Sequence, residues 1–260
     1  MEILIRPDAH GVAQAAADIL TAYAAKGSTL GLATGSTPLP TYQELIRRHR
    51  EEGLSFADCT AFLLDEYVGL PHDHPESYYR TIRREFTDHV DIDDARVNSP
   101  NVMAEDLPAA GAAYDAAIAE AGGIAVQLLG IGTNGHVGFN EPASSLGSPT
   151  RPVVLHPQTV ADNARFFDNN EDEVPTLVIT QGLGTIQRAG HLLLIATGEG
   201  KADAIARSVE GPVTVMCPGS VIQLHSRVTV VVDEAAASKL ANIDYYRRSE
   251  QLRPEWMLNY

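Results

Sequence analysis

The chain has 260 residues, 44% of them hydrophobic, and its 19 Lys and Arg against 34 Asp and Glu give a formal net charge of −15. This length and composition predict a globular protein of one large α/β domain or two small ones, and they exclude disorder over most of the chain. The acidic charge disfavours binding to nucleic acid or to an anionic membrane, because the overall field repels polyanions. A small anionic ligand could still bind at a local basic site.

The apolar runs and the cysteines further narrow the class of protein. No run approaches the roughly 20 apolar residues that a membrane span needs, and the first residues, Met1–Pro7, are typical of a strand and not of a signal peptide. The two cysteines, Cys59 and Cys217, form neither a disulfide framework nor a CxxC metal pair. We therefore expect a cytoplasmic protein.

Short β-branched or leucine-rich runs alternate with helical patterns along the whole chain. This alternation predicts an α/β fold with an open, mostly parallel, Rossmann-like sheet and helices on both faces. The predicted strands are Ile3–Ile5, Thr29–Ala33, Thr60–Leu64, Ala125–Leu129, His191–Ala196 and Arg227–Val232. The predicted helices are Ala9–Ala25, Leu39–Glu52, Ser77–Phe86, Pro108–Ala121, Lys201–Val209 and Glu234–Leu240.

No linker divides the chain, so we expect residues 1–260 to form a single domain. One segment, residues 142–175, is rich in Ser, Pro, Asn and Asp and only weakly periodic. Long loops in compact domains usually cover an active site or carry a functional insertion. We expect a lid-like segment here and call it the covering segment.

The second predicted strand ends in a candidate phosphate loop. Thr34, Gly35, Ser36 and Thr37 follow this strand and lead into a helix. Glycine lets the backbone approach a ligand, and a helix N-terminus flanked by hydroxyls suits a phosphate. The alternative is that Ser36 or Thr37 only caps the helix. A Walker A loop is excluded, because the spacing GxxxxGK[ST] does not occur.

The third predicted strand ends in two adjacent carboxylates. Asp65 and Glu66 stand where an open parallel sheet binds its ligands, and they form a candidate general-base site. One alternative is a pair of surface acids. Another is a metal site on His72 and His74, but these two histidines would need further ligands.

A glycine-rich loop follows the fourth predicted strand. Residues 130–135 satisfy GxGxxG, but no helix follows at once and no acid-ending strand comes about 20 residues later, so a dinucleotide fingerprint is disfavoured. The loop carries His136, with Asn134 and Glu141 near enough to orient it. A histidine titrates near neutral pH, so His136 is a candidate for moving protons. The alternative is a structural loop histidine.

Two cations complete the candidate site. Lys201, one of three lysines, follows the fifth predicted strand at a helix start, and Arg165 lies in the covering segment. Lys201 could hold a ligand anion beside the helix N-terminus, or it could be a solvated lysine, and Arg165 is a second candidate cation. No serine or cysteine stands in a nucleophile motif. A carboxylate base, a histidine and a phosphate loop together suit proton abstraction next to a carbonyl or imine of a sugar phosphate.

Several of these motifs resemble, in order, those of the glucosamine-6-phosphate deaminase family. They are Leu64–Pro71, His74–Tyr78, Gly135–Pro142, Arg165–Asp168 and Thr197–Lys201. The resemblance implies an enzyme that converts glucosamine 6-phosphate and water to fructose 6-phosphate and ammonia, in amino-sugar catabolism and without a metal or organic cofactor. It implies that Asp65 moves the C2 proton to C1, that His136 opens the sugar ring with Glu141 and Asn134 tuning it, and that the phosphate loop, Arg165 and Lys201 bind the phosphate.

The same resemblance bears on regulation and assembly. Some members of the family are hexamers that N-acetylglucosamine 6-phosphate activates at a site between subunits, and Ser144, Arg151 and Tyr245 match positions of that site. The lysine-threonine pair expected after Arg151 is Val153-Val154 here, so we expect a weak or absent allosteric response. The family contains monomers and hexamers, which leaves a homo-oligomer open.

Two other functions remain as alternatives. A 6-phosphogluconolactonase would hydrolyse a lactone and would not need a carboxylate base at Asp65. A non-catalytic sugar-phosphate sensor would need the phosphate loop but not Asp65, His136 and Glu141. The sequence also leaves open whether the amino sugar is glucosamine or galactosamine 6-phosphate.

Overall fold

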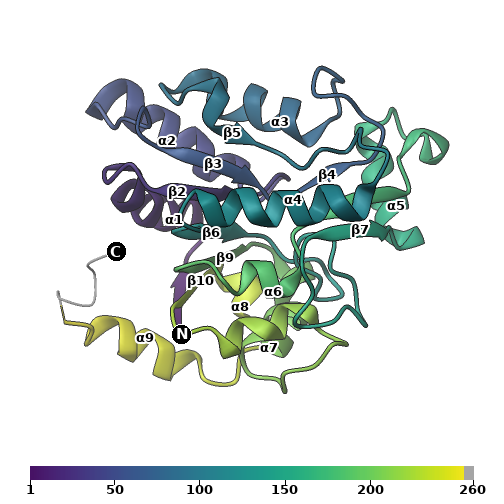
Figure 1. Ribbon diagram of the computed structural model, residues 1–260. Helices are drawn as coiled ribbons and strands as arrows, with labels where there is room; N and C mark the ends of the chain where they lie inside the picture. Colours follow the sequence, from purple (N-terminus) through teal and green to yellow (C-terminus); the bar gives the residue numbers. More distant parts are fainter. Residues whose placement is uncertain (255–260) are drawn as a thin grey trace.

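The computed structural model describes residues 1–254 and has a central parallel sheet between two layers of helices (Figure 1). Within this range, seven strands form the sheet in the order β1-β10-β9-β6-β2-β3-β5, and every neighbouring pair is parallel. Their bounds are β1 Glu2–Arg6, β2 Thr29–Leu32, β3 Thr60–Leu63, β5 Val97–Asn98, β6 Val126–Leu129, β9 Leu192–Ala196 and β10 Val228–Asp233. All the strands predicted from the sequence lie in this sheet, so the predicted fold class is confirmed.

The helices divide between the two faces of the sheet. Buried side chains of α1 (Ala9–Ala24), α2 (Leu39–Glu52) and α3 (Tyr78–Glu85) pack against one face. Those of α4 (Leu107–Glu120), α6 (Leu183–Ile186), α7 (Ala202–Val209) and α8 (Glu234–Ala237) pack against the other. Helix α8 ends before the predicted Leu240 because tight turns follow it, in which Ser238 and Leu240 donate backbone hydrogen bonds to the carbonyls three residues earlier.

A second, smaller sheet lies beside the carboxyl ends of the central strands. Its strands β4 (Asp65–Tyr67), β8 (Leu177–Thr180) and β7 (Arg151–Val154) pair antiparallel in that order. Strand β4 follows β3 after one residue, Leu64, whose N–H donates to Leu32 of the central sheet and whose carbonyl accepts from Gln181. The two sheets are therefore joined at the position where Asp65 begins.

The covering segment is more regular than its sequence pattern predicted. It contains strand β7 and helix α5 (Pro157–Asn163), which His156 caps by accepting the N–H of Gln158. Pro157 stands at a position that favours a helix start, because the N–H it lacks would have no partner within the helix. Elements of four and seven residues are too short to give a clear period, which is why the sequence pattern does not reveal them.

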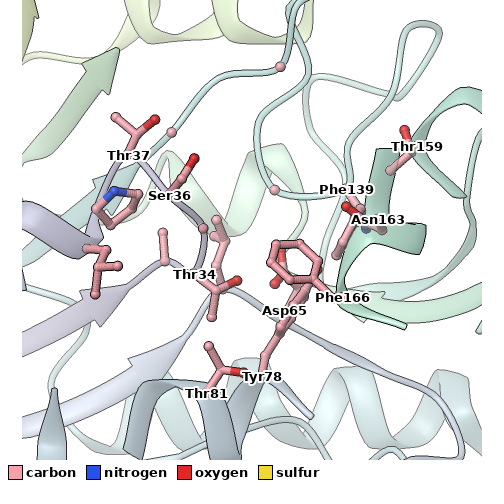
Figure 2. A pocket seen from close by; sticks show the side chains of 18 of the residues that line it. Thr34, Ser36, Thr37, Asp65, Tyr78, Thr81, Phe139, Thr159, Asn163 and Phe166 are labelled. Atoms are coloured by element: carbon pink, nitrogen blue, oxygen red, sulfur yellow. The ribbon is translucent and has the colours of Figure 1, made fainter. Parts of the chain in front are cut away.

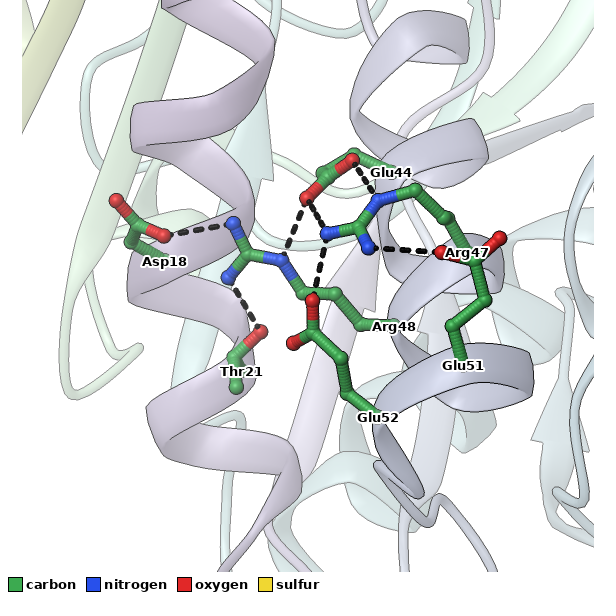
Figure 3. Close-up of polar contacts among 7 residues, drawn as sticks. All are labelled: Asp18, Thr21, Glu44, Arg47, Arg48, Glu51 and Glu52. Atoms are coloured by element: carbon green, nitrogen blue, oxygen red, sulfur yellow. Dashed lines mark hydrogen bonds and ion pairs between the residues drawn. The ribbon is translucent and has the colours of Figure 1, made fainter.

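Helices α1 and α2 are joined by a network of ion pairs in which the central residues are partly buried (Figure 3). Arg48 of α2 reaches Asp18 and Thr21 of α1, at 2.7 and 3.1 Å, and also pairs with Glu44. Arg47 pairs with Glu44 as well, at 2.7 Å. This network fixes α2, the helix whose N-terminus follows the candidate phosphate loop.

The last described helix, α9 (Ile243–Gln251), packs against the edge strand β1, where Arg6 and Glu250 form an ion pair of 2.7 Å. Within residues 1–254, no helix combines the length and the apolar character needed to cross a membrane.

Strand order places a crevice at the middle of the central sheet. From β2 the chain moves outward to β3 and β5, and it then returns to β6 on the other side of β2. The connections from β2 and β6 therefore run on opposite faces of the sheet. Open α/β sheets bind their ligands at such a switch point, beyond the carboxyl ends of the strands.

Candidate active site

A cavity of about 600 Å³ opens at this switch point. The sequence-predicted residues that line it are Thr34, Gly35, Ser36, Thr37, Asp65, His136, Arg165 and Lys201. Figure 2 shows Ser36 and Thr37 on one side of the cavity and Thr159 and Asn163 on the other, with Asp65 between them. The structure therefore brings the candidate base, the candidate histidine and the candidate phosphate loop into one pocket.

Asp65 is the buried carboxylate at the base of the cavity. Its residue is 6% exposed, and burial together with the neighbouring Glu66 carboxylate raises its pKa well above the usual range. A carboxylate with a raised pKa binds a proton more tightly than an ordinary one, which is what a base needs to remove a proton from carbon. The interpretation of Asp65 as a surface acid is therefore wrong.

Glu66 has a different environment from Asp65. It is fully buried and accepts hydrogen bonds from the backbone N–H groups of Tyr67, Tyr78 and Tyr79, at 2.9, 2.8 and 2.8 Å. Tyr78 and Tyr79 are the first residues of α3, so the Glu66 carboxylate lies at a helix N-terminus, where negative charge is stabilised. Glu66 is absent from the cavity lining and serves to anchor α3 to β4.

His136 faces the cavity with a carboxylate and an amide behind it. Its Nδ1 lies 3.4 Å from Glu141 Oε2, and its backbone N–H donates to Asn134 Oδ1 at 3.0 Å. Asn134 Nδ2 in turn donates to Glu141 Oε2 at 2.7 Å. Burial alone would raise the pKa of Glu141, but His136, Thr159 and Asn134 together lower it to about 2, so Glu141 is ionised beside His136.

The glycine-rich loop makes room for the His136 ring. A Cβ on Gly132 would overlap three atoms of the imidazole. The second glycine of the GxGxxG pattern therefore brings the backbone close to the candidate histidine, in place of a dinucleotide pyrophosphate.

The candidate phosphate loop leaves its hydroxyls available to the cavity. Helix α2 begins with Pro38 at its N-cap, and no side chain makes a capping hydrogen bond there. The capping interpretation of Ser36 and Thr37 is therefore wrong. Gly35 has a φ of 113°, a left-handed conformation that a residue with a Cβ rarely adopts. Both observations favour the interpretation of residues 34–37 as a ligand loop.

Two cations line the same cavity from different elements. Lys201 is the last residue of the short 3₁₀ turn η5 (Glu199–Lys201), which follows β9, and it occupies the N-cap position of α7. Arg165 lies in the covering segment, within the 3₁₀ turn η3 (Ala164–Phe166), and its guanidinium carbon is 4.7 Å from the centre of the Phe166 ring. One positive charge of the pocket thus comes from the end of a central strand, and the other comes from the covering segment.

The two histidines considered for a metal make other contacts. The His72 ring stacks on Tyr79 with 4.0 Å between the ring centres, and its Nε2 lies 2.7 Å from Ser99 Oγ. His74 Nδ1 accepts the backbone N–H of Glu76 at 3.1 Å. Among residues 1–254, no three His, Cys, Asp or Glu side chains are grouped in a way that could hold a metal ion.

The three residues matched to an allosteric site do not meet within one chain. Arg151 of β7 donates to Asn140 Oδ1 at 2.9 Å, and Ser144 lies in the loop after Glu141, whose carbonyl accepts its N–H. Tyr245 lies on α9, on the opposite side of the molecule from β7 (Figure 1), and is 67% exposed. Val154, where the resemblance implies a polar residue, is 73% exposed.

Sequence reasoning missed part of the cavity wall. Its remaining side chains include Tyr67, Tyr78, Thr159, Asn163 and Phe166. The three aromatic residues lie within the motifs Leu64–Pro71, His74–Tyr78 and Arg165–Asp168, so their proximity to the site could have been expected. Thr159 and Asn163 have the four-residue spacing of a helix face, but the helix that carries them has only seven residues.

Comparisons with known proteins identify the family of this chain. Residues 7–231 match the family model described as glucosamine-6-phosphate isomerases/6-phosphogluconolactonase. A relative from Corynebacterium kroppenstedtii named glucosamine-6-phosphate deaminase is 63% identical over 256 residues, which are 98% of this chain and 99% of the relative. A Rhodococcus jostii protein of the same name is 60% identical over 257 residues, with the same coverage of 98% and 99%.

Solved structures of the two kinds of enzyme in this family also resemble the chain. The structure of a monomeric glucosamine-6-phosphate deaminase superposes with a TM-score of 0.89 at 41% identity, over 92% of this chain and 100% of the other. The 6-phosphogluconolactonase of Trypanosoma cruzi superposes with a TM-score of 0.71 at 21% identity, over 92% and 97%, which shows a shared fold alone. The chain therefore belongs to the family of glucosamine-6-phosphate isomerases and 6-phosphogluconolactonases.

Proposed function

We propose that this protein converts glucosamine 6-phosphate and water to fructose 6-phosphate and ammonia. The observation that carries the proposal is the presence of a buried carboxylate and a carboxylate-linked histidine in one cavity with a phosphate loop. The names of the relatives at 63% and 60% identity support the same activity.

In the proposed mechanism, His136 and Asp65 act in sequence. His136 moves a proton between the ring oxygen and the C1 hydroxyl, which opens the pyranose. Asp65 then takes the proton from C2 and returns it at C1 through an enolamine. The resulting imine at C2 adds water and loses ammonia, which leaves the ketose. A raised pKa suits Asp65 to this task, because the group must hold the proton between the two carbons.

The neighbours of His136 are proposed to keep it in place through the reaction. Glu141 carries a negative charge that stabilises the protonated imidazole, and Asn134 fixes the Glu141 oxygen that faces the ring. Asn134 contributes no charge, so Glu141 is the one carboxylate in this group of three side chains.

The phosphate is proposed to lie at the end of the cavity formed by residues 34–37. The hydroxyls of Thr34, Ser36 and Thr37 and the start of α2 offer hydrogen-bond donors, and Lys201 and Arg165 offer positive charge. These cations lie at one site, so the protein can bind a single phosphate despite its net charge of −15.

We further propose that one chain is sufficient for catalysis and that N-acetylglucosamine 6-phosphate does not activate it. A related structure at 41% identity is described as monomeric, and one cavity already contains the candidate base, the candidate histidine and the phosphate loop. Val153 and Val154 offer neither a charge nor a hydroxyl to a phosphate. Light scattering measures the oligomeric state, and substrate curves with and without the effector measure the activation.

A panel of three substrates tests the proposed activity. Ammonia and ketose formation are measured with glucosamine 6-phosphate and with galactosamine 6-phosphate, and acid release is measured with 6-phosphogluconolactone. We expect equal amounts of ammonia and fructose 6-phosphate from the glucosamine compound. Rapid lactone hydrolysis without ammonia release would favour the lactonase function instead, and tight binding of all three without turnover would favour a sensor.

A further inference from the structure

Two side chains of helix α5 contact neighbours of the candidate base and of the candidate histidine. Thr159 and Asn163 are four residues apart, so they lie on the same face of the helix. Both line the cavity, and Figure 2 shows them next to each other on the wall opposite Ser36 and Thr37.

Thr159 contacts the carboxylate that supports His136. Its hydroxyl donates a hydrogen bond of 2.6 Å to Glu141 Oε1, while the other oxygen, Oε2, faces Asn134 and His136. The threonine is 7% exposed, so little water competes for this bond. The Glu141 carboxylate is therefore held by the glycine-rich loop on one side and by the covering helix on the other.

Asn163 makes a second contact, with the strand that carries the candidate base Asp65. Its Nδ2 donates to the Tyr67 hydroxyl at 2.8 Å, and the Tyr78 hydroxyl donates to the same oxygen at 3.1 Å. Tyr67 ends strand β4, which begins at Asp65. Helix α5 thus contacts both the strand that carries Asp65 and the carboxylate that lies beside His136.

Apolar packing fixes α5 in this place. Leu155 lies just before the helix, and Ala164 and Phe167 lie just after it. All three are buried in one cluster with Tyr67 and Phe139. Arg165, the proposed phosphate ligand of the cover, follows Asn163 by two residues, so the helix that supports Glu141 continues directly into a substrate contact.

We propose that Thr159 is a positioning residue for proton transfer by His136. This inference rests on the deaminase function proposed above. Thr159 acts through Glu141, because its hydroxyl fixes the carboxylate that lies beside the imidazole.

The proposal is tested by a substitution that removes the Thr159 hydroxyl but keeps the shape of the side chain. For Thr159→Val we expect kcat to fall by roughly tenfold to a hundredfold, which is the range for a hydrogen bond to a charged group, with KM changed less than about twofold. Thr159→Ser keeps the hydroxyl and retains most of the wild-type kcat. Thr176→Val makes the same change at an exposed position of the segment that leads to β8 and leaves kcat unchanged.

A double-mutant cycle separates a positioning role from a general loss of structure. If Thr159 acts through Glu141, Thr159→Val lowers kcat in the wild type but causes no further loss in a Glu141→Gln background. Additive losses would overturn the proposal, as would a raised KM with unchanged kcat, since that result would mean direct contact with the sugar. Thermal unfolding of each variant shows that it is folded.

The wild-type rate distinguishes failure of this inference from failure of the proposed function. Absence of ammonia release from glucosamine 6-phosphate by the wild type would contradict the function and this inference together. An active wild type with a fully active Thr159→Val would overturn the role of Thr159 alone.

Discussion

Asp65 and Glu66 are consecutive buried carboxylates, and their side chains point to different surroundings. They alternate on strand β4, so Asp65 lines the cavity while Glu66 accepts three backbone N–H groups, two of them at the start of α3. Burial raises the pKa of both groups, and for Asp65 the charge of Glu66 adds to the effect of burial. Glu66 thus builds the environment that makes Asp65 a stronger base, and it is itself held by the backbone.

The amide at position 134 keeps a second carboxylate away from Glu141. In Asn134→Asp, the new carboxylate would face Glu141 Oε2 at a separation now spanned by a hydrogen bond of 2.7 Å. Two carboxylates this close cannot both ionise easily, so the pKa of one of them rises strongly. We expect the acidic limb of the kcat profile to move to higher pH by about one unit or more. Rates of ammonia release across the pH range check this.

A control for this change exists in the covering segment. Asn170→Asp adds the same charge at an exposed amide outside the cavity lining and leaves the profile in place. An unchanged acidic limb in Asn134→Asp would show that ionisation of the carboxylates at 134 and 141 does not determine that limb.

Lys201 is expected to bind the substrate phosphate. Lys201→Met removes a charge-assisted hydrogen bond to the dianion, so KM for glucosamine 6-phosphate rises by roughly tenfold to a hundredfold with a smaller effect on kcat. Lys239→Met is the matched control, because Lys239 pairs with Asp203 on the exposed surface, at 2.6 Å, and lies outside the cavity lining. A KM that stays at the wild-type value in Lys201→Met would remove this residue from the phosphate site.

The network between α1 and α2 predicts a contribution to acid stability. Hydrogen bonds from Arg47, opposed by burial and reinforced by Arg48, lower the pKa of Glu44 to about 2. A lowered folded-state pKa means that this stabilisation is present above the unfolded-state pKa of about 4.5 and is lost as the pH falls toward 2. Glu44→Gln is expected to lower the free energy of unfolding by about 1 kcal/mol at pH 7 and by less at pH 3.

Chemical denaturation at both pH values measures this difference. Glu51→Gln removes a more exposed partner of Arg47, at 3.1 Å, and is expected to have a smaller effect at either pH. An equal loss for Glu44→Gln at pH 7 and pH 3 would show that the charge of Glu44 does not stabilise the folded state.

The fold and much of the site could be predicted because they depend on strand ends. Asp65, His136 and Lys201 each follow a strand of the central sheet, and parallel strands bring such positions to one edge. Strands such as β5 and helices such as α6 were missed because two to four residues are too few to show a period. The distinct roles of Asp65 and Glu66 depend on which face of β4 each occupies, and β4 itself has only three residues.

The contacts of Thr159 and Asn163 were beyond sequence reasoning for a different reason. Their partners, Glu141 and Tyr67, are 18 and 96 residues away along the chain. No local pattern predicts such a pairing, because it depends on how the smaller sheet positions the covering segment relative to the central sheet.

The central claim is that Asp65 moves the C2 proton of glucosamine 6-phosphate. It is tested most directly by measuring ammonia and fructose 6-phosphate formed by the wild type and by Asp65→Asn, which keeps the shape of the side chain. We expect equal amounts of the two products from the wild type, and a loss of rate of at least about a hundredfold in the variant, without a fall in melting temperature. Full activity of Asp65→Asn, or ammonia released together with an aldose phosphate, would contradict the claim.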